Sequence, residues 1–107
     1  MNDPSWHVRL LSVIRALVLY EGEVDPQRYA EHVPVARRVP GATFRHGPVF
    51  GSPVGEPAHR YYAEFEWPDR AAFDEAMASA EWRESGKDAM AMGVRFTVEL
   101  AELDERS

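Results

Sequence analysis

The chain has 107 residues, of which 45% are hydrophobic and 28% are charged, and its formal net charge is -6. The 12 basic residues are scattered rather than gathered into a stripe, which argues against a nucleic-acid partner. There is no cysteine, which excludes disulfides, thiolate metal sites and cysteine nucleophiles.

The first apolar segment, VRLLSVIRALVLY at residues 8–20, predicts a strand. Its last five residues are apolar at successive positions, which is typical of a strand covered on both faces. Arg15 interrupts the segment, and a bilayer span needs roughly 20 apolar residues. No small-residue cleavage site precedes the acidic EGE that follows. We therefore expect no membrane contact and a cytoplasmic protein.

The segment from Asp25 to Val39 predicts the first helix. Asp25 can cap it, and Pro26 suits the first helical position. Pro40 and Gly41 form a stop signal, so the helix is expected to end by Val39. Its apolar residues recur at helical spacing as one stripe: Tyr29, Val33 and Ala36.

Two strands are expected next. Residues 42–51 predict a bent or edge strand, because Gly47 and Pro48 interrupt it, and residues 52–57 form a turn-rich connector. HRYYAEFEW at 59–67 alternates clearly, as a strand does. One face carries Tyr61, Ala63, Phe65 and Trp67, and the other carries Arg60, Tyr62, Glu64 and Glu66.

Asp69 can cap a second helix, whose core-facing residues are Phe73, Ala76, Met77 and Ala80. Residues 82–92 are expected to be helical at first and then a loop closed by Gly93. Residues 94–100 alternate as a last strand, followed by the charged tail ELDERS.

The order β-α-β-β-α-β predicts an α+β, ferredoxin-like fold, in which two helices cover one face of a four-stranded antiparallel sheet. We expect one domain over residues 1–107, with its core at about 8–103. The other face of the sheet would expose aromatic and aliphatic area, and such patches mark interfaces. We therefore expect a homodimer whose two sheets face each other.

The histidines lack paired-ligand spacing, and no phosphate-binding loop or nucleophile elbow is present, so we expect no metal and no cofactor. His32 is the main candidate for chemistry. It follows Tyr29 by three residues, which places both near one helical edge, and Pro34 should distort the backbone beside them. It is either an acid/base group or a helix-edge histidine bonded to a neighbouring strand or loop.

Glu64 and Glu66 share a strand face with Tyr62. They are ordinary surface carboxylates if that face meets solvent. If a second sheet covers it, the pKa of a carboxylate there should rise, and Glu64 becomes a candidate acid or base. Arg45 and His46, near the bend at Gly47, are either ligand contacts or a solvated strand edge.

The pattern of Tyr29, His32 and Pro34, then Pro40-Gly41 and Phe44, resembles EthD-type domains. VLY at 18–20, YYAEFEW at 61–67, residues 69–73 and Ser79 support the resemblance, which covers roughly residues 14–103.

This resemblance implies a dimeric α+β barrel with a cleft for small, mostly apolar or aromatic organic compounds. Relatives on this scaffold include polyketide cyclases, muconolactone isomerases and monooxygenases that use neither metal nor flavin. By position, the role of a cleft histidine in EthD-like isomerases would fall to His32.

The leading hypothesis is cofactor-independent acid/base chemistry of an isomerase, cyclase or dehydratase type. His32 and Glu64 are the predicted catalytic residues. The predicted ligand-binding residues are Tyr20, Tyr29, Phe44, Tyr62 and Glu66. The alternatives are a non-catalytic ligand-binding or accessory subunit of an oxidoreductase system, and a cofactor-free monooxygenase.

Overall fold

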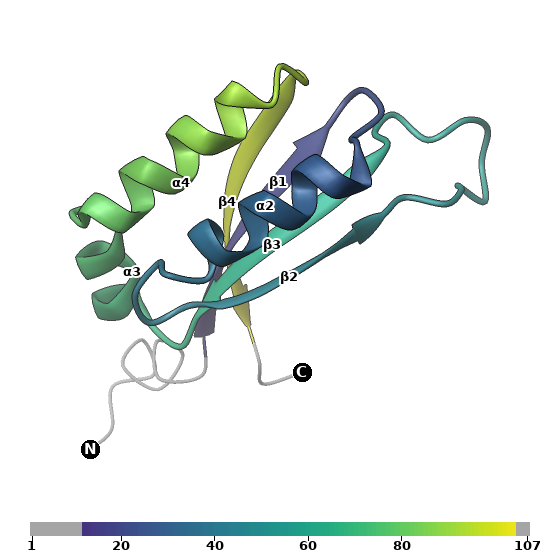
Figure 1. Ribbon diagram of the computed structural model, residues 1–107. Coiled ribbons are helices and arrows are strands. Elements are labelled where there is room, and N and C mark those ends of the chain that lie inside the picture. The colour runs from purple at the N-terminus through teal and green to yellow at the C-terminus, as the bar shows by residue number, and fades with distance from the viewer. Residues whose placement is uncertain (1–11, 105–107) are drawn as a thin grey trace.

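In the computed structural model, which describes residues 12–104, three helices lie on one face of a four-stranded antiparallel sheet (Figure 1). The predicted α+β, ferredoxin-like arrangement is confirmed. The predicted strand residues 8–11, His7 and the last three residues of the tail lie outside the described residues. The elements are β1 (Ser12–Tyr20), α2 (Pro26–Ala36), β2 (Thr43–Pro48), β3 (Tyr61–Trp67), α3 (Arg70–Met77), α4 (Ala80–Ala91) and β4 (Phe96–Asp104).

The strands lie in the order β2-β3-β1-β4, so β1 and β3 are central and β2 and β4 form the edges. In this register Ala16 faces Phe65 of β3 and Leu100 of β4. Because side chains alternate along a strand, the register assigns each residue to the helix-covered face or to the opposite, open face.

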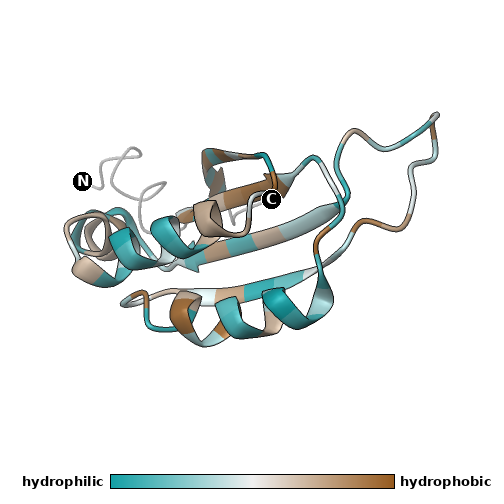
Figure 2. Ribbon diagram, turned by 45° about the horizontal axis from the view of Figure 1, so that its top comes forward, coloured by the Kyte–Doolittle hydropathy of each residue, from teal (hydrophilic) through white to brown (hydrophobic). Residues whose placement is uncertain are grey.

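The core lies between the sheet and the helices. Trp67, Tyr20 and Tyr29 are its largest fully buried side chains, and the outward faces of the helices are largely hydrophilic (Figure 2). The Trp67 indole Nε1 donates a hydrogen bond of 3.0 Å to the carbonyl of Pro40. This bond holds the turn after α2, where Gly41 has a φ of 72° that favours glycine.

The predicted caps are confirmed. Asp25 accepts from the backbone N–H of Gln27 at 3.1 Å, and Asp69 accepts from Ala72 at 2.8 Å. Helix α2 passes Pro34 and ends at Ala36, earlier than the predicted limit at Val39. Proline has no N–H for the carbonyl of Ala30, and both residues are exposed there, so water can satisfy that carbonyl.

The second half of the chain differs from the prediction in two places. The expected helical region is two helices: α3 ends at Met77 with Ala78 as its C-cap, and Ser79 caps α4 by accepting from the N–H of Trp82 at 3.1 Å. Helix α4 then runs to Ala91, where a loop was expected. Strand β4 continues to Asp104, through part of the expected tail, because it pairs with the beginning of β1 at Ser12.

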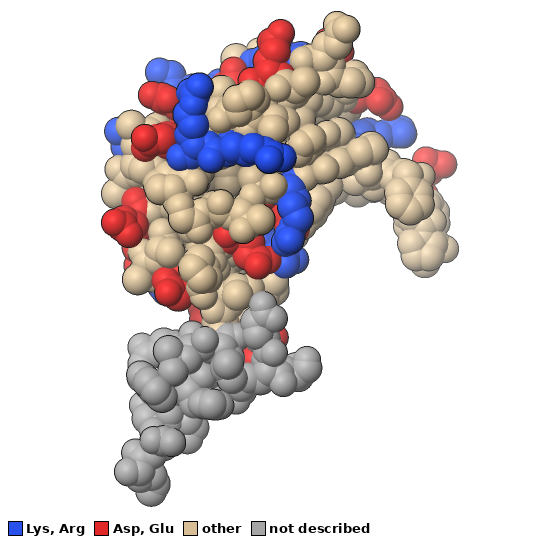
Figure 3. Space-filling model, turned by 60° about the horizontal axis from the view of Figure 1, so that its bottom comes forward, with Lys and Arg blue, Asp and Glu red and all other residues tan. Residues whose placement is uncertain are grey.

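On the side of the molecule that Figure 3 shows, basic and acidic side chains are intermixed, and no large area carries one sign of charge. Among residues 12–104, no helix is both long and apolar enough to cross a membrane.

Candidate functional site

A cavity of about 60 Å³ lies between the helix-covered face of the sheet and helices α2 and α4. Most of its wall is aromatic or aliphatic, and His32 is the one imidazole among the residues that line it. The predicted ligand contacts Tyr20, Tyr29 and Phe44 also line it, together with Phe65, Trp82 and Phe96. The cavity therefore places an imidazole in apolar surroundings.

His32 is 3% exposed and faces helix α4. Its Nδ1 lies 2.8 Å from Oδ2 of Asp88, and its ring centroid lies 5.2 Å from that of Tyr29. The side chain is bonded to a neighbouring helix, rather than to the strand or loop of the second reading, and it also lines the cavity.

Arg28 holds Asp88 in place. Its Nη2 donates to Oδ1 of Asp88 at 2.8 Å and to the Asp88 carbonyl at 3.3 Å. The hydrogen bond from Arg28 lowers the pKa of Asp88; burial opposes the shift, and the hydrogen bond from His32 reinforces it. Asp88 is therefore an ionised acceptor at neutral pH.

An ionised carboxylate only accepts hydrogen bonds, so the Nδ1 of His32 must carry the proton between them. In neutral imidazole, Nε2 is then the basic nitrogen, and His32 lines the cavity. This is the arrangement in which a carboxylate sets the tautomer of a histidine and stabilises its cation.

Asp88 and Arg28 were missed by the sequence analysis. Asp88 is 56 residues from His32 along the chain, and no spacing rule connects them. The contact exists because α2 and α4 pack side by side on the sheet. If all of residues 82–92 had been predicted as helix, Asp88 would have been placed on a helix. That prediction would still not have placed Asp88 beside His32.

A second, larger hollow of about 570 Å³ lies on the outer side of Tyr29, between α2 and the ends of β2 and β3. His46 and Tyr61 form one wall, with the His46 Nδ1 at 2.7 Å from the Tyr61 hydroxyl. Burial lowers the pKa of His46, and the charge of Arg37 adds to this effect. We call this hollow the outer groove and the smaller one the inner cavity.

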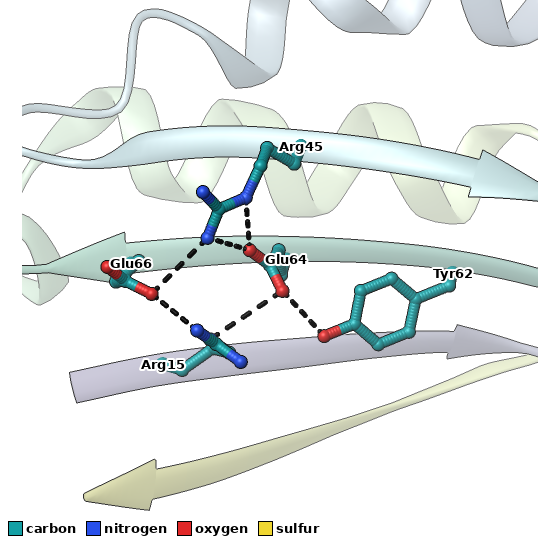
Figure 4. A network of polar contacts seen from close by, with 5 residues as sticks. All are labelled: Arg15, Arg45, Tyr62, Glu64 and Glu66. Atoms are coloured by element: carbon teal, nitrogen blue, oxygen red, sulfur yellow. Dashed lines mark hydrogen bonds and ion pairs between the residues drawn. The ribbon is translucent and has the colours of Figure 1, made fainter. Parts of the chain in front are cut away.

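The open face of the sheet carries a different polar cluster. Five residues from adjacent strands contact one another on it (Figure 4): Arg15, Arg45, Tyr62, Glu64 and Glu66. Nη2 of Arg15 donates to Oε1 of Glu66 at 2.6 Å, and the Tyr62 hydroxyl donates to Oε1 of Glu64 at 2.7 Å. Two arginines thus neutralise two glutamates.

In the single chain the pKa of Glu64 moves in the opposite direction to the rise expected in a dry cleft. Burial raises it, but hydrogen bonds from Tyr62 and Arg45, with the charge of Arg15, outweigh burial and lower the pKa. The side chain is 8% exposed. Glu64 is therefore held as an anion.

The structure divides the predicted site residues into two groups. His32, Tyr20, Tyr29 and Phe44 meet at the inner cavity. Glu64, Glu66 and Tyr62 lie across the sheet, on its open face. Within one chain, Glu64 therefore does not reach the cavity of His32. Across residues 12–104, potential metal ligands do not gather in groups of three or more.

Three solved structures show what this chain is similar to. An EthD family protein from Bacillus halodurans C-125 has 29% identity and a TM-score of 0.70, covering 85% of this chain and 98% of that chain. A dimeric ferredoxin-like protein of unknown function from Jannaschia sp. CCS1 has 24% identity and a TM-score of 0.63, covering 86% and 98%. The hydroxynitrile lyase from Passiflora edulis has 14% identity and a TM-score of 0.68, covering 89% and 96%.

The predicted resemblance to the EthD family is confirmed by the first of these structures. The other two are less than 25% identical and share the fold alone. No family model matches the chain, and a comparison with curated proteins finds no match.

Proposed function

We propose that the chain forms a homodimer that binds a small apolar or aromatic organic compound and moves a proton on it without a cofactor. One observation carries this proposal: a buried histidine that lines an apolar cavity is bonded at 2.8 Å to a carboxylate on another helix. His32 is the acid/base group, and Asp88 positions it.

The reaction class follows from this geometry. Nε2 of His32 takes a proton from a carbon next to a carbonyl group, and the electron pair of the broken C–H bond moves into an enolate. Asp88 stabilises the imidazolium that forms. Where a C=C bond adjoins the enolate, its electrons are shared with the far carbon of that bond, and returning the proton there moves the double bond and leaves the protein unchanged. One such group contributes about 10²- to 10⁴-fold, and orientation in the cavity must supply the rest.

The homodimer rests on the open face. Val13, Leu17 and Leu19 are half-buried there in the single chain, around a charge cluster that is internally neutral. The described chain is a slab with extents of 53 × 38 × 16 Å, and apolar area on an open face favours a further covering layer. A second sheet would complete the layers, and Tyr62, Glu64 and Glu66 would then line the interface.

The test measures proton exchange on carbon acids. Aryl ketones are incubated with the protein in D₂O, and deuterium uptake next to the carbonyl is followed by NMR. We expect His32→Ala to slow the exchange by about 10²- to 10⁴-fold, while Gln27→Ala, on the exposed side of the same helix, leaves it unchanged. An exchange rate in His32→Ala within a few-fold of the wild type would remove the assignment.

The second candidate is a ligand-binding subunit without chemistry, favoured by the largely apolar wall of the inner cavity. It predicts saturable binding of the same ketones with no deuterium uptake. Oxygen consumption with an electron-rich phenol would instead point to a cofactor-free monooxygenase.

A further inference from the structure

Ser85 is a buried polar residue that the proposed acid/base chemistry does not use. It lies in the middle of α4 and is 4% exposed. A serine inside a helix usually points to solvent or bonds to a carbonyl one turn earlier. Ser85 does neither, since its hydroxyl makes no hydrogen bond with another residue of the range 12–104. A buried hydroxyl without a partner costs free energy, unless something else supplies the bond.

The Ser85 hydroxyl oxygen is accessible from the inner cavity. Within residues 12–104, the fully enclosed side-chain atoms that lack a hydrogen-bond partner are Nε of Arg15 and the Tyr29 hydroxyl. The Ser85 oxygen also lacks a partner but is not fully enclosed, so it keeps some accessible surface. Ser85 lines the inner cavity and is otherwise buried. The hydroxyl is therefore available to a molecule in that cavity.

Ser85 shares this cavity with His32. Asp88 follows Ser85 by three residues on α4, and residues at this spacing are neighbours on one helix face. Oδ2 of Asp88 lies 2.8 Å from Nδ1 of His32. One face of α4 thus supplies both the carboxylate that is bonded to the imidazole and a hydroxyl for the space that the imidazole lines.

The inner cavity opens to the surface between α4 and β4. Gly86 of α4 and Val98 of β4 both line it, and both are exposed, Val98 by 44%. The cavity has a volume of about 60 Å³. Since a water molecule takes roughly 30 Å³ of liquid volume, only a few heavy atoms fit inside. A carbonyl group and the carbon next to it can enter, and a larger body must lie in the opening.

We propose that Ser85 holds the carbonyl oxygen of a small ketone while His32 moves the proton. The Ser85 hydroxyl donates a hydrogen bond to that oxygen, and Nε2 of His32 takes a proton from the neighbouring carbon. The electron pair of the broken C–H bond moves toward the oxygen, so the hydrogen bond strengthens as negative charge develops there. Ser85 keeps its own proton throughout. This inference rests on the proposed function for the role of His32, but the contact with the oxygen can be tested without turnover.

The binding experiment compares two probes of similar shape, acetophenone and ethylbenzene, of which only the first has an oxygen. Their dissociation constants are measured by NMR titration of the full chain and of Ser85→Ala. We expect Ser85→Ala to weaken acetophenone roughly threefold to tenfold and to leave ethylbenzene unchanged. Equal changes for both probes, or no change for acetophenone, would overturn the assignment.

Deuterium exchange on acetophenone tests the role of Ser85 during proton transfer. We expect Ser85→Ala to slow the exchange by about 10²-fold, more than it weakens binding, because the enolate oxygen carries more negative charge than the carbonyl oxygen. Lys87→Ala, exposed on the same helix, should leave the exchange unchanged. A loss of exchange no larger than the loss of affinity would contradict a role at the developing charge.

A second pair of variants tests the opening. A Cβ at Gly86 would meet no atom within 4 Å, so Gly86→Trp places a large ring there without displacing a neighbour, whereas Lys87→Trp places one outside the lining residues. We expect Gly86→Trp to weaken both probes at least tenfold and Lys87→Trp to change neither. If Gly86→Trp binds both probes as tightly as the wild type, the ligand does not enter between α4 and β4.

Thermal unfolding separates ligand recognition from a structural role. The Ser85 hydroxyl has no partner to lose, and alanine is the better helix former, so Ser85→Ala should keep or raise the Tm. A fall of several degrees would mean that the hydroxyl is bonded within the folded chain, which contradicts the proposal.

His32→Ala distinguishes this inference from the proposed function. If His32→Ala exchanges deuterium normally while Ser85→Ala still discriminates between the probes, the catalytic assignment of His32 fails and the contact of Ser85 with the oxygen stands. If His32→Ala loses exchange and Ser85→Ala does not discriminate, the reverse holds.

Discussion

On the helix-covered face of the sheet, a carboxylate reaches a buried histidine from another helix. On the open face, two carboxylates meet two arginines from neighbouring strands. Asp88 and His32 come together only because α2 and α4 pack side by side, whereas Glu64, Arg45 and Arg15 are brought together by strand register and lie on one face. The first arrangement leaves Nε2 as the basic nitrogen of His32, and the second neutralises its own charge.

This difference shows that burial alone does not make a carboxylate reactive. Glu64 is more buried than Asp88, with side chains 8% and 28% exposed. Donors hold both carboxylates as anions, but only Asp88 has a histidine among its donors. The groups that are hydrogen-bonded to a carboxylate, rather than its burial, therefore decide what it can do.

The largest expected effect is on turnover. His32→Ala should lower deuterium exchange by about 10²- to 10⁴-fold, whereas Glu64→Gln, across the sheet, should leave it within a few-fold of the wild type. Both rates are measured by NMR on the same ketone. An equal loss of deuterium exchange in both variants would mean that the two faces of the sheet form one site. It would contradict the distinction between the two faces.

The next effect concerns the open face. Leu17 lies between Glu64 and Glu99 in the register, so Leu17→Glu adds a like charge and should weaken the proposed dimer roughly tenfold or more. Ala71→Glu, on the exposed surface of α3, should have no effect. Sedimentation equilibrium measures both. A wild-type chain that stays monomeric at micromolar concentration would refute the dimer itself.

Removing charge from the open-face cluster should reduce stability. Glu64→Gln leaves Arg15 and Arg45 without their most buried partner, and we expect a loss of about 1 to 3 kcal/mol in the free energy of unfolding. Glu75→Gln, exposed on α3, should change it by less than about 0.5 kcal/mol. Urea denaturation provides both values, and similar losses would show that the cluster adds no stability of its own.

The smallest effect is on acid stability. The pKa of Asp88 is lowered in the folded chain, chiefly by Arg28. The stabilisation is therefore present above the unfolded pKa, near pH 4, and is lost as the pH falls through the folded value. We expect Asp88→Asn to cost about 1 kcal/mol at neutral pH, and the gap to the wild type to close on acidification. A gap independent of pH would contradict this linkage.

Much of the fold could be predicted, because its signals are local. Asp25 and Asp69 cap helices where their spacing indicated, and the alternation in YYAEFEW assigned each residue of β3 to its face. The end of β4 could not be predicted, since an exposed edge strand tolerates charged residues that also suit a tail. The sequence analysis did not identify Ser79 as the cap of a separate helix, because apolar residues at helical spacing continue to Ala80.

Sequence by itself determined the order of the strands, the start of α2 and the two faces of β3, which follow from capping and from periods of two and 3.6 residues, and it named His32 as the candidate. Only the tertiary structure decided which carboxylate is hydrogen-bonded to His32. Asp88 reaches it through helix packing across 56 residues, while Glu64, the carboxylate that alternation pointed to, lies across the sheet. Local periodicity sets the direction of a side chain along its own element, but only packing sets which elements meet.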